Sequence, residues 1–236
     1  MYEKFGKRAM DIAVSLIALI ILFPVLLVLT IVGGIQMKGN PFFVQIRPGK
    51  DEKLFKMLKF RSMTCEKDAH GNLLPDDKRL TDYGRFLRDS SLDELPELVN
   101  ILIGDLSLVG PRPQLVRDMV FMTPVQRKRH TVRQGLTGLA QINGRNRMTW
   151  EQKFDYDLQY ISHISFREDM RILWHTVGKV FYREGVSAEG METAEDFGDY
   201  LLAKGAVTQE EYDKKQAQAK EILAAFEGES HATPVR

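Results

Sequence analysis

The chain has 236 residues, 44% hydrophobic and 28% charged, which is enough for one domain with a buried core and a small appendage. This composition excludes an intrinsically disordered or low-complexity protein. The single cysteine, Cys65, excludes an internal disulfide and a thiolate metal cluster, so we expect a reducing, cytosol-facing location.

The net charge of +1 hides an uneven distribution of charge along the chain. Residues 187–236 hold 11 acidic and 5 basic side chains, which leaves a net charge of +7 on residues 1–186. A basic body suits an anionic membrane surface, nucleic acid or a phosphorylated substrate, and net charge alone does not choose among them.

An uncharged apolar segment of 26 residues lies between Asp11 and Lys38. As a helix it would measure about 39 Å, more than the roughly 30 Å hydrocarbon core of a bilayer. Pro24 lies near its middle and leaves the carbonyl of Ile20 unpaired, which predicts a kink. A signal peptide is disfavoured, because the segment is too long and no small-residue cleavage site follows it.

Basic residues flank this apolar segment on both sides. A helix that spans the membrane carries the richer basic set on its cytoplasmic side only. The sequence therefore slightly favours a helix that enters one leaflet, breaks at Pro24 and returns, over a kinked span across the bilayer. The flanking residues are Lys4, Lys7 and Arg8 before the segment, and Lys38, Arg47, Lys50 and Lys53 after it.

Two short extended runs surround the turn at residues 48–51, which predicts a β-hairpin. Helical spacing dominates from Thr81 onward. Residues 95–110 are too rich in leucine, isoleucine and valine for a solvated helix, so we expect them in the core or in the membrane interface.

The loop Gly110–Pro113 is stiff, because two prolines fix φ on either side of Arg112. A guanidinium on such a loop suits bidentate binding of phosphate, although a rigid turn with a solvated arginine is the better interpretation of this motif alone. A cationic run at 127–133 and a glycine-rich segment at 134–146 follow. The chain has neither a nucleoside-triphosphate loop nor a dinucleotide-binding glycine motif.

The C-terminal part predicts two helices joined at Gly205, with Thr193 and Thr208 as N-caps. Glu211 completes a capping box with Thr208. We expect an acidic hairpin that packs on the body of the protein or on a partner. No catalytic constellation is visible in it.

The stretch R-D-S-S-L-D-E-L-P-E-L-V-N, residues 88–100, places Asp93 and Glu94 just ahead of a proline. Ser91 with Glu94 matches a capping box. Pro96 is tolerated only in the first helical turn, which favours Asp93 as the helix start. There an ionised acid, beside N–H groups able to receive a phosphate, could instead serve phosphoryl transfer, with Glu94 holding a divalent cation. The residues alone favour capping.

Several motifs in fixed order resemble those of the bacterial sugar transferases, the monotopic phosphoglycosyl transferases. They cover about residues 1–190, and the chain is most similar to the short members, which consist of the catalytic core alone. The motifs are K-R-x-x-D before the proline-broken segment, Q-x-R-P-G, F-K-x-x-K-F-R-S-M, S-L-D-E-L-P-E-L-x-N, G-D-x-S-x-V-G-P-R-P, G-L-T-G-L-A-Q-I-N-G-R-N and W-x-x-K-F-x-Y-D.

The resemblance implies an α+β, mainly helical fold with a re-entrant N-terminal membrane helix broken at Pro24, amphipathic interfacial helices and a small β-hairpin. We expect a membrane helix over 1–38, a catalytic domain over 39–186 and the acidic hairpin over 187–236. The implied location is the bacterial inner membrane, with the catalytic domain on its cytoplasmic face.

The resemblance also implies transfer of a sugar-1-phosphate from a UDP-sugar to undecaprenyl phosphate with release of UMP, the first membrane step of glycoconjugate biosynthesis. We expect the sugar to be an N-acetylated hexose. Asp93 would be the nucleophile that forms a covalent phosphosugar intermediate in a ping-pong mechanism, and Glu94 with Asp93 would bind Mg²⁺. The other implied site residues are Lys59, Arg88 and Arg112, which would hold phosphates, and Arg145, Asp157 and Asp169, with substrate or structural roles.

The implied partners are the UDP-sugar, undecaprenyl phosphate and membrane lipid, with no nucleic acid; a second copy of the chain or downstream glycosyltransferases are further candidates. Two positions depart from the family pattern. Phe23 stands where close members often have serine, and Gln134 where the family usually has proline. Two other functions stay open, a membrane-tethered scaffold that binds anionic lipid and a metal-dependent phosphodiesterase.

Overall fold

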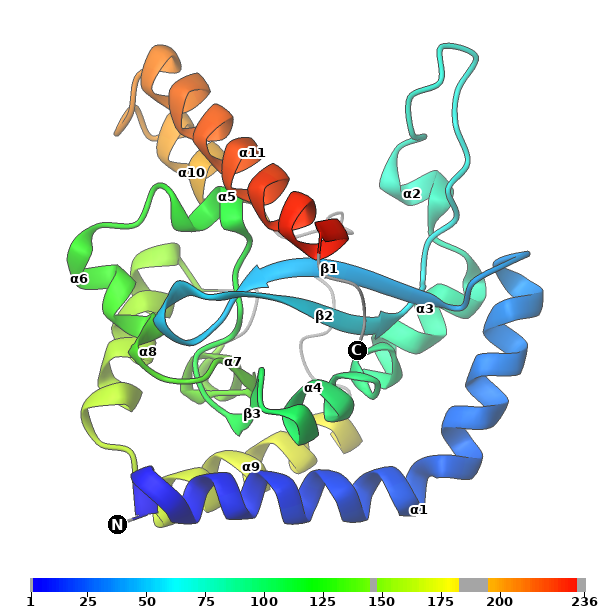
Figure 1. Ribbon diagram of the computed structural model, residues 1–236, viewed down its shortest axis with the longest axis vertical. Helices are drawn as coiled ribbons and strands as arrows, with labels where there is room; N and C mark the ends of the chain where they lie inside the picture. Colours follow the sequence, from blue (N-terminus) through cyan, green and yellow to red (C-terminus); the bar gives the residue numbers. More distant parts are fainter. Residues whose placement is uncertain (1, 145–147, 183–194, 233–236) are drawn as a thin grey trace.

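Several helices lie between a long N-terminal helix and a two-stranded antiparallel sheet, and the C-terminal helices lie on the other side of that sheet (Figure 1). The structure is a computed structural model that describes residues 2–144, 148–182 and 195–232. The predicted class is confirmed: the fold is α+β and mainly helical, with a small β-hairpin and an apolar N-terminal helix. The helices are α1 (Lys7–Gln36), α2 (Asp76–Arg79), α3 (Asp82–Asp89), α4 (Glu97–Ile103), α5 (Val116–Met119), α6 (Pro124–Arg127), α7 (Leu139–Asn143), α8 (Trp150–Ser162), α9 (Phe166–Tyr182), α10 (Phe197–Ala203) and α11 (Gln209–Ala232). The shorter helical turns are η1 (Tyr2–Gly6), η2 (Lys50–Glu52), η3 (Leu92–Glu94) and η4 (Lys128–Thr131).

The predicted hairpin pairs β1 (Phe42–Pro48) with β2 (Leu54–Phe60) in antiparallel register, from Phe42 opposite Phe60 to Pro48 opposite Leu54. Alternation along β2 buries Phe55 and Met57, and Phe60, the last residue of the strand, is buried as well. Phe55 and Met57 pack in one cluster with residues of α4, and Phe60 packs in another with Leu87 of α3. The last residues of the hairpin lead directly to the candidate site.

A second, parallel pair of strands, β3 (Ser107–Val109) and β4 (Gly135–Thr137), was not predicted, and the expectation of helix through residues 107–109 was wrong. Helix α4 ends at Ile103 because Gly104 takes a left-handed conformation, with φ of 104°. All three residues of β3 are buried, so this short strand has no alternation for sequence analysis to detect.

Helix α1 contains Pro24 and changes direction partway along its length, so that it forms two arms (Figure 1). The first arm is anchored to the core by two side chains. Asp11 Oδ1 accepts hydrogen bonds from Ser107 Oγ and the Leu108 N–H, both at 3.0 Å. Arg8 donates to the carbonyls of Ile101 at 2.6 Å and Leu102 at 2.8 Å, at the C-terminal end of α4.

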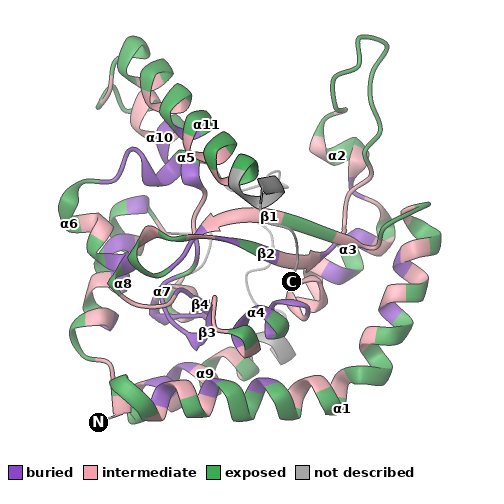
Figure 2. Cartoon of the chain, viewed as in Figure 1, coloured by how far each residue is buried: buried purple, intermediate pink, exposed green. Residues whose placement is uncertain are grey.

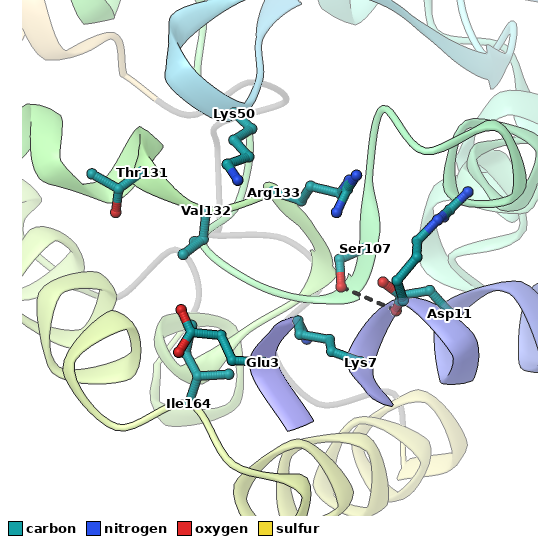
Figure 3. A pocket seen from close by; sticks show the side chains of 10 residues that line it. Glu3, Lys7, Asp11, Lys50, Ser107, Thr131, Val132, Arg133 and Ile164 are labelled. Carbon is teal, nitrogen blue, oxygen red and sulfur yellow. Dashed lines mark hydrogen bonds between the residues drawn. The ribbon is translucent and has the colours of Figure 1, made fainter. Parts of the chain in front are cut away.

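A hollow lies beside this anchor, with Lys7, Asp11 and Ser107 among the residues that line it (Figure 3). Lys7 forms a buried ion pair of 2.7 Å with Asp169, which also accepts a hydrogen bond of 2.7 Å from Tyr160. The K-R-x-x-D motif at the start of α1 thus serves to attach this helix to the rest of the fold.

The second arm of α1 packs on the same domain. The Tyr83 hydroxyl donates to the Leu29 carbonyl at 2.9 Å, and Leu29 packs in one cluster with Phe60 and Leu87. Elsewhere α1 leaves large apolar side chains exposed, including Ile20, Phe23 and Ile35 (Figure 2). Among the described residues, one helix, Tyr2–Gln36, is long and apolar enough to cross a membrane.

The C-terminal hairpin consists of α10 and α11, joined at Gly205 as predicted, where φ is 68°. Thr208 caps α11 by accepting from the Glu211 N–H at 3.2 Å. Thr193 lies outside the described residues, and Asp196 precedes the first residue of α10. The hairpin packs on the body, one of the two predicted alternatives, through Phe197 against Trp150 and Phe154.

Candidate active site

Asp93 and Glu94 lie in η3, a single turn between α3 and α4. Ser91 ahead of it is left-handed, with φ of 56°, and its side chain makes no capping hydrogen bond, so the capping-box interpretation was wrong. Pro96 occupies the N-cap position of α4, which places the helix start three residues after Asp93, contrary to prediction. The reason is that the chain reverses at Ser91 and needs one tight turn before a helix can begin.

Two cations from distant segments converge on Glu94. Its Oε1 atom accepts from Arg112 Nη2 at 2.6 Å and from Lys59 Nζ at 3.0 Å. Burial would raise the pKa of Glu94, but the charges and hydrogen bonds of Arg112 and Lys59 outweigh it and hold the pKa well below its ordinary value. Glu94 is therefore ionised at every pH at which the protein is expected to work.

Asp93 has the opposite electrostatic environment. Burial and the charge of the neighbouring Glu94 raise the pKa of Asp93 to about 6, although Lys59, Arg112 and Arg88 act to lower it. Adjacent carboxyls with such different pKa values suit different chemical roles. At neutral pH Asp93 is mostly an ionised carboxylate, with a more basic oxygen than an ordinary aspartate has.

Arg88, in the last turn of α3, donates from Nε to Ser62 Oγ at 3.0 Å. The three cations predicted to hold phosphates are therefore brought together, since all of them act on the pKa of Asp93. The three reach the turn from the end of β2, from α3 and from the loop after β3.

Glu97 belongs to this cluster, and sequence analysis missed it. Lys59 Nζ lies 3.0 Å from Oε1 of both Glu94 and Glu97. Burial raises the pKa of Glu97 to about 7 against the opposing charge of Lys59. The available signal was its spacing of three residues from Glu94, which brings side chains to one side of a helical turn.

Asp157 supports the Arg112 loop through Arg129, and its described contacts do not include Asp93. It accepts from Arg129 Nε at 2.8 Å, and Arg129 Nη2 donates to the Arg112 carbonyl at 2.6 Å. Gln134 stands where the resemblance leads us to expect a proline. Its buried side-chain amide donates hydrogen bonds to the carbonyls of Arg129 and Val132, which restrain the loop in place of a proline ring. These contacts fix the backbone that presents Arg112.

Asp169, another predicted residue, also lies away from the cluster. Asp169 bonds with Tyr2, Lys7 and Tyr160 at the start of α1. Arg145 lies outside the described residues.

The resemblance implies that Mg²⁺ binds at these carboxylates. No group of three or more histidine, cysteine or acidic side chains in the described ranges could hold a metal. Mg²⁺ commonly binds through one or two carboxylates together with substrate phosphates and water. Adjacent Asp93 and ionised Glu94 fit that donor set.

Comparisons with known proteins identify the family of this chain. The bacterial sugar transferase family matches residues 2–183. The uncharacterized sugar transferase EpsL of Bacillus subtilis (strain 168) is 46% identical over 191 residues, which are 81% of this chain and 95% of EpsL. A UDP-glucose:undecaprenyl-phosphate glucose-1-phosphate transferase of Klebsiella pneumoniae is 42% identical over 185 residues, covering 74% of this chain and 40% of that protein. The galactosyl transferase CpsE of Streptococcus agalactiae serotype III (strain NEM316) is 36% identical over 195 residues, covering 76% and 43%.

Proposed function

Since the chain belongs to the bacterial sugar transferase family, we propose that it is a phosphoglycosyl transferase that moves a sugar-1-phosphate from a UDP-sugar to undecaprenyl phosphate and releases UMP. The observation that carries the proposal is the carboxylate of Asp93 beside ionised Glu94, with Lys59, Arg88 and Arg112 around them. Three cations around two acids suit a substrate that brings its own negative charge, such as a diphosphate.

In the first step an Asp93 oxygen attacks the phosphorus that bears the sugar. The bond from that phosphorus to the oxygen of UMP breaks, UMP leaves, and the phosphosugar stays on Asp93 as an acyl phosphate. In the second step an oxygen of undecaprenyl phosphate attacks the same phosphorus, which releases the carboxylate and gives undecaprenyl diphosphate-linked sugar.

This chain's cations bind and orient the phosphates in both steps. Arg112 and Lys59 neutralise charge on the substrate diphosphate when they exchange part of their pairing with Glu94. Glu94 and Asp93 would hold Mg²⁺, which when bound neutralises charge on the diphosphate. One site can serve a soluble and a lipid substrate in turn because the phosphosugar is held on the protein between them, so we propose ping-pong kinetics.

A re-entrant α1 is supported by the contacts of both its arms with one domain, through Asp11 in the first arm and Leu29 in the second. A straight span would carry one end to the other side of the membrane. The exposed Trp174 and Val177 of α9, whose first turn contacts the start of α1, support an interfacial helix beside it. We place the catalytic domain on the cytoplasmic face of the inner membrane, where nucleotide sugars are available.

The test is UMP release by the purified, detergent-solubilised protein with Mg²⁺ and a panel of UDP-sugars, each with and without undecaprenyl phosphate. The panel includes N-acetylated hexoses, glucose and galactose. We expect sustained release only when one particular sugar and the lipid are both present. Sustained hydrolysis without lipid would support the phosphodiesterase instead. No release with any sugar would leave two alternatives, a donor outside the panel or a membrane-tethered scaffold that binds anionic lipid.

A further inference from the structure

The hairpin of α10 and α11 lies beyond the residues that match the family, yet it is joined to the segment that follows Arg112 (Figure 1). We infer that this hairpin is a positioning element, which holds the Arg112 loop in the conformation that binds the substrate diphosphate. The inference rests on the proposed function, since it assigns a phosphate to Arg112.

The first connection is a single buried carboxylate, Asp118, which is 2% exposed. Its Oδ1 atom accepts from the N–H of Phe197, the first residue of α10, at 2.9 Å. Its Oδ2 atom accepts from the N–H of Leu115 at 3.1 Å. One side chain thus ties the start of the hairpin to a residue three positions after Arg112.

The second connection is apolar. The Phe197 ring lies 5.1 Å from Trp150 and 5.0 Å from Phe154, measured between ring centroids. Backbone of α10 approaches so closely that a Cβ on Gly198 would lie 2.7 Å from the Phe121 ring. The hairpin is therefore packed against α8 and the end of the α5 segment rather than tethered loosely to them.

Helix α11 adds a third connection, because Lys215 Nζ donates to the Val120 carbonyl at 2.9 Å. Arg117, on α5, also forms an ion pair of 2.5 Å with Asp196, immediately before α10. Because Arg117 is half-exposed, this ion pair contributes little to stability by itself. Together these contacts hold residues 115–120 from the side of the hairpin.

The body restrains the loop at three successive carbonyls. The Gly135 N–H donates to Pro111 at 2.8 Å, Arg129 donates to Arg112 at 2.6 Å, and Arg47 donates to Pro113 at 3.3 Å. The hairpin supplies the restraint on the C-terminal side, where no strand or long helix follows the loop. The Arg112 side chain is 44% exposed while it contacts Glu94. The direction of its guanidinium therefore depends on the position of its own backbone more than on packing by surrounding side chains.

The experiment uses the full-length chain with Phe197→Ala, which removes the aromatic contact, and Asp118→Asn, which keeps the size of the side chain but cannot accept both N–H groups. Matched controls are Phe226→Ala, at a half-buried ring outside the aromatic cluster, and Asp213→Asn, at an exposed acid of α11. Circular dichroism and membrane association confirm that each variant folds. Two quantities are measured, hydrogen exchange of residues 111–118 and the steady-state constants for the UDP-sugar.

We expect exchange of residues 111–118 to become about tenfold faster in both test variants and not in the controls. The KM for the UDP-sugar should rise roughly five- to tenfold while kcat stays within about twofold, because a restraint on ground-state binding is lost. Unchanged exchange, or faster exchange with an unchanged KM, would overturn the inference. If the wild type releases no UMP, the proposed function fails, and the exchange measurement still decides whether the hairpin restrains the loop.

Discussion

Asp93 and Glu94 are neighbours in one turn, and their surroundings suit them to different chemical roles. Arg112 and Lys59 bind Glu94 and keep it ionised, whereas burial and the charge of Glu94 raise the pKa of Asp93 to about 6. A carboxylate of raised pKa is a better nucleophile than one held by two cations. The difference in pKa between the two acids depends on which of them the cations contact. The conformation of the turn between Ser91 and Pro96 sets this contact.

Asp93→Asn should reduce sustained UMP release by at least about a hundredfold, because the amide cannot form the acyl phosphate. It should not destabilise the protein at neutral pH. A carboxyl whose pKa is raised in the folded state binds its proton more tightly there, so its ionisation opposes folding as pH rises through that range. Thermal unfolding of both proteins measures this, and a large fall in Tm with residual transfer would show a structural role instead.

The rate of the first step should fall with acidification as Asp93 takes up its proton. We expect the acid limb of kcat/KM for the UDP-sugar to have a midpoint near pH 6, from the pKa of about 6. Glu97→Gln serves as the control, since the pKa of Glu97 is raised to about 7 and could produce a similar limb. A limb that disappears in this variant would assign the titration to Glu97.

Among the elements, α1 is the helix that we propose enters the membrane, and its two arms make a topology prediction. Cysteines at positions 3 and 40, in a Cys65→Ser background, should both react with a membrane-impermeant thiol reagent only from the cytoplasmic side. A cysteine at position 21, an exposed apolar position of α1, should be unreactive because lipid covers it. Labelling of positions 3 and 40 from opposite sides would establish a span.

The elements that sequence analysis predicted are those with strong local signals. Pro48 and Gly49 between two extended runs predict the β1–β2 hairpin, and Pro24 predicts the change of direction in α1. Strands β3 and β4 were missed because three residues in a parallel pair derive their structure from packing with a partner far along the chain. The Lys59–Glu97 pair was missed for the same reason, since it depends on how β2 meets α4.

For the whole molecule, the membrane helix, the cation-lined turn and the C-terminal hairpin are joined through one core. Asp11 connects α1 to β3, and the loop after β3 carries Arg112 to Glu94. Asp157 and Asp118 hold that loop from opposite ends. The identity of the donor sugar could not be predicted from the sequence, because discrimination among hexoses depends on a few contacts in the bound complex.

The most direct test of the central claim is the mass of the intact protein after incubation with the donor UDP-sugar and Mg²⁺ in the absence of lipid. We predict that the wild type gains the mass of one sugar-1-phosphate with one equivalent of UMP released, that undecaprenyl phosphate removes this mass, and that Asp93→Asn gains none. An unshifted mass in a wild-type protein that still performs lipid-dependent UMP release would contradict the covalent mechanism.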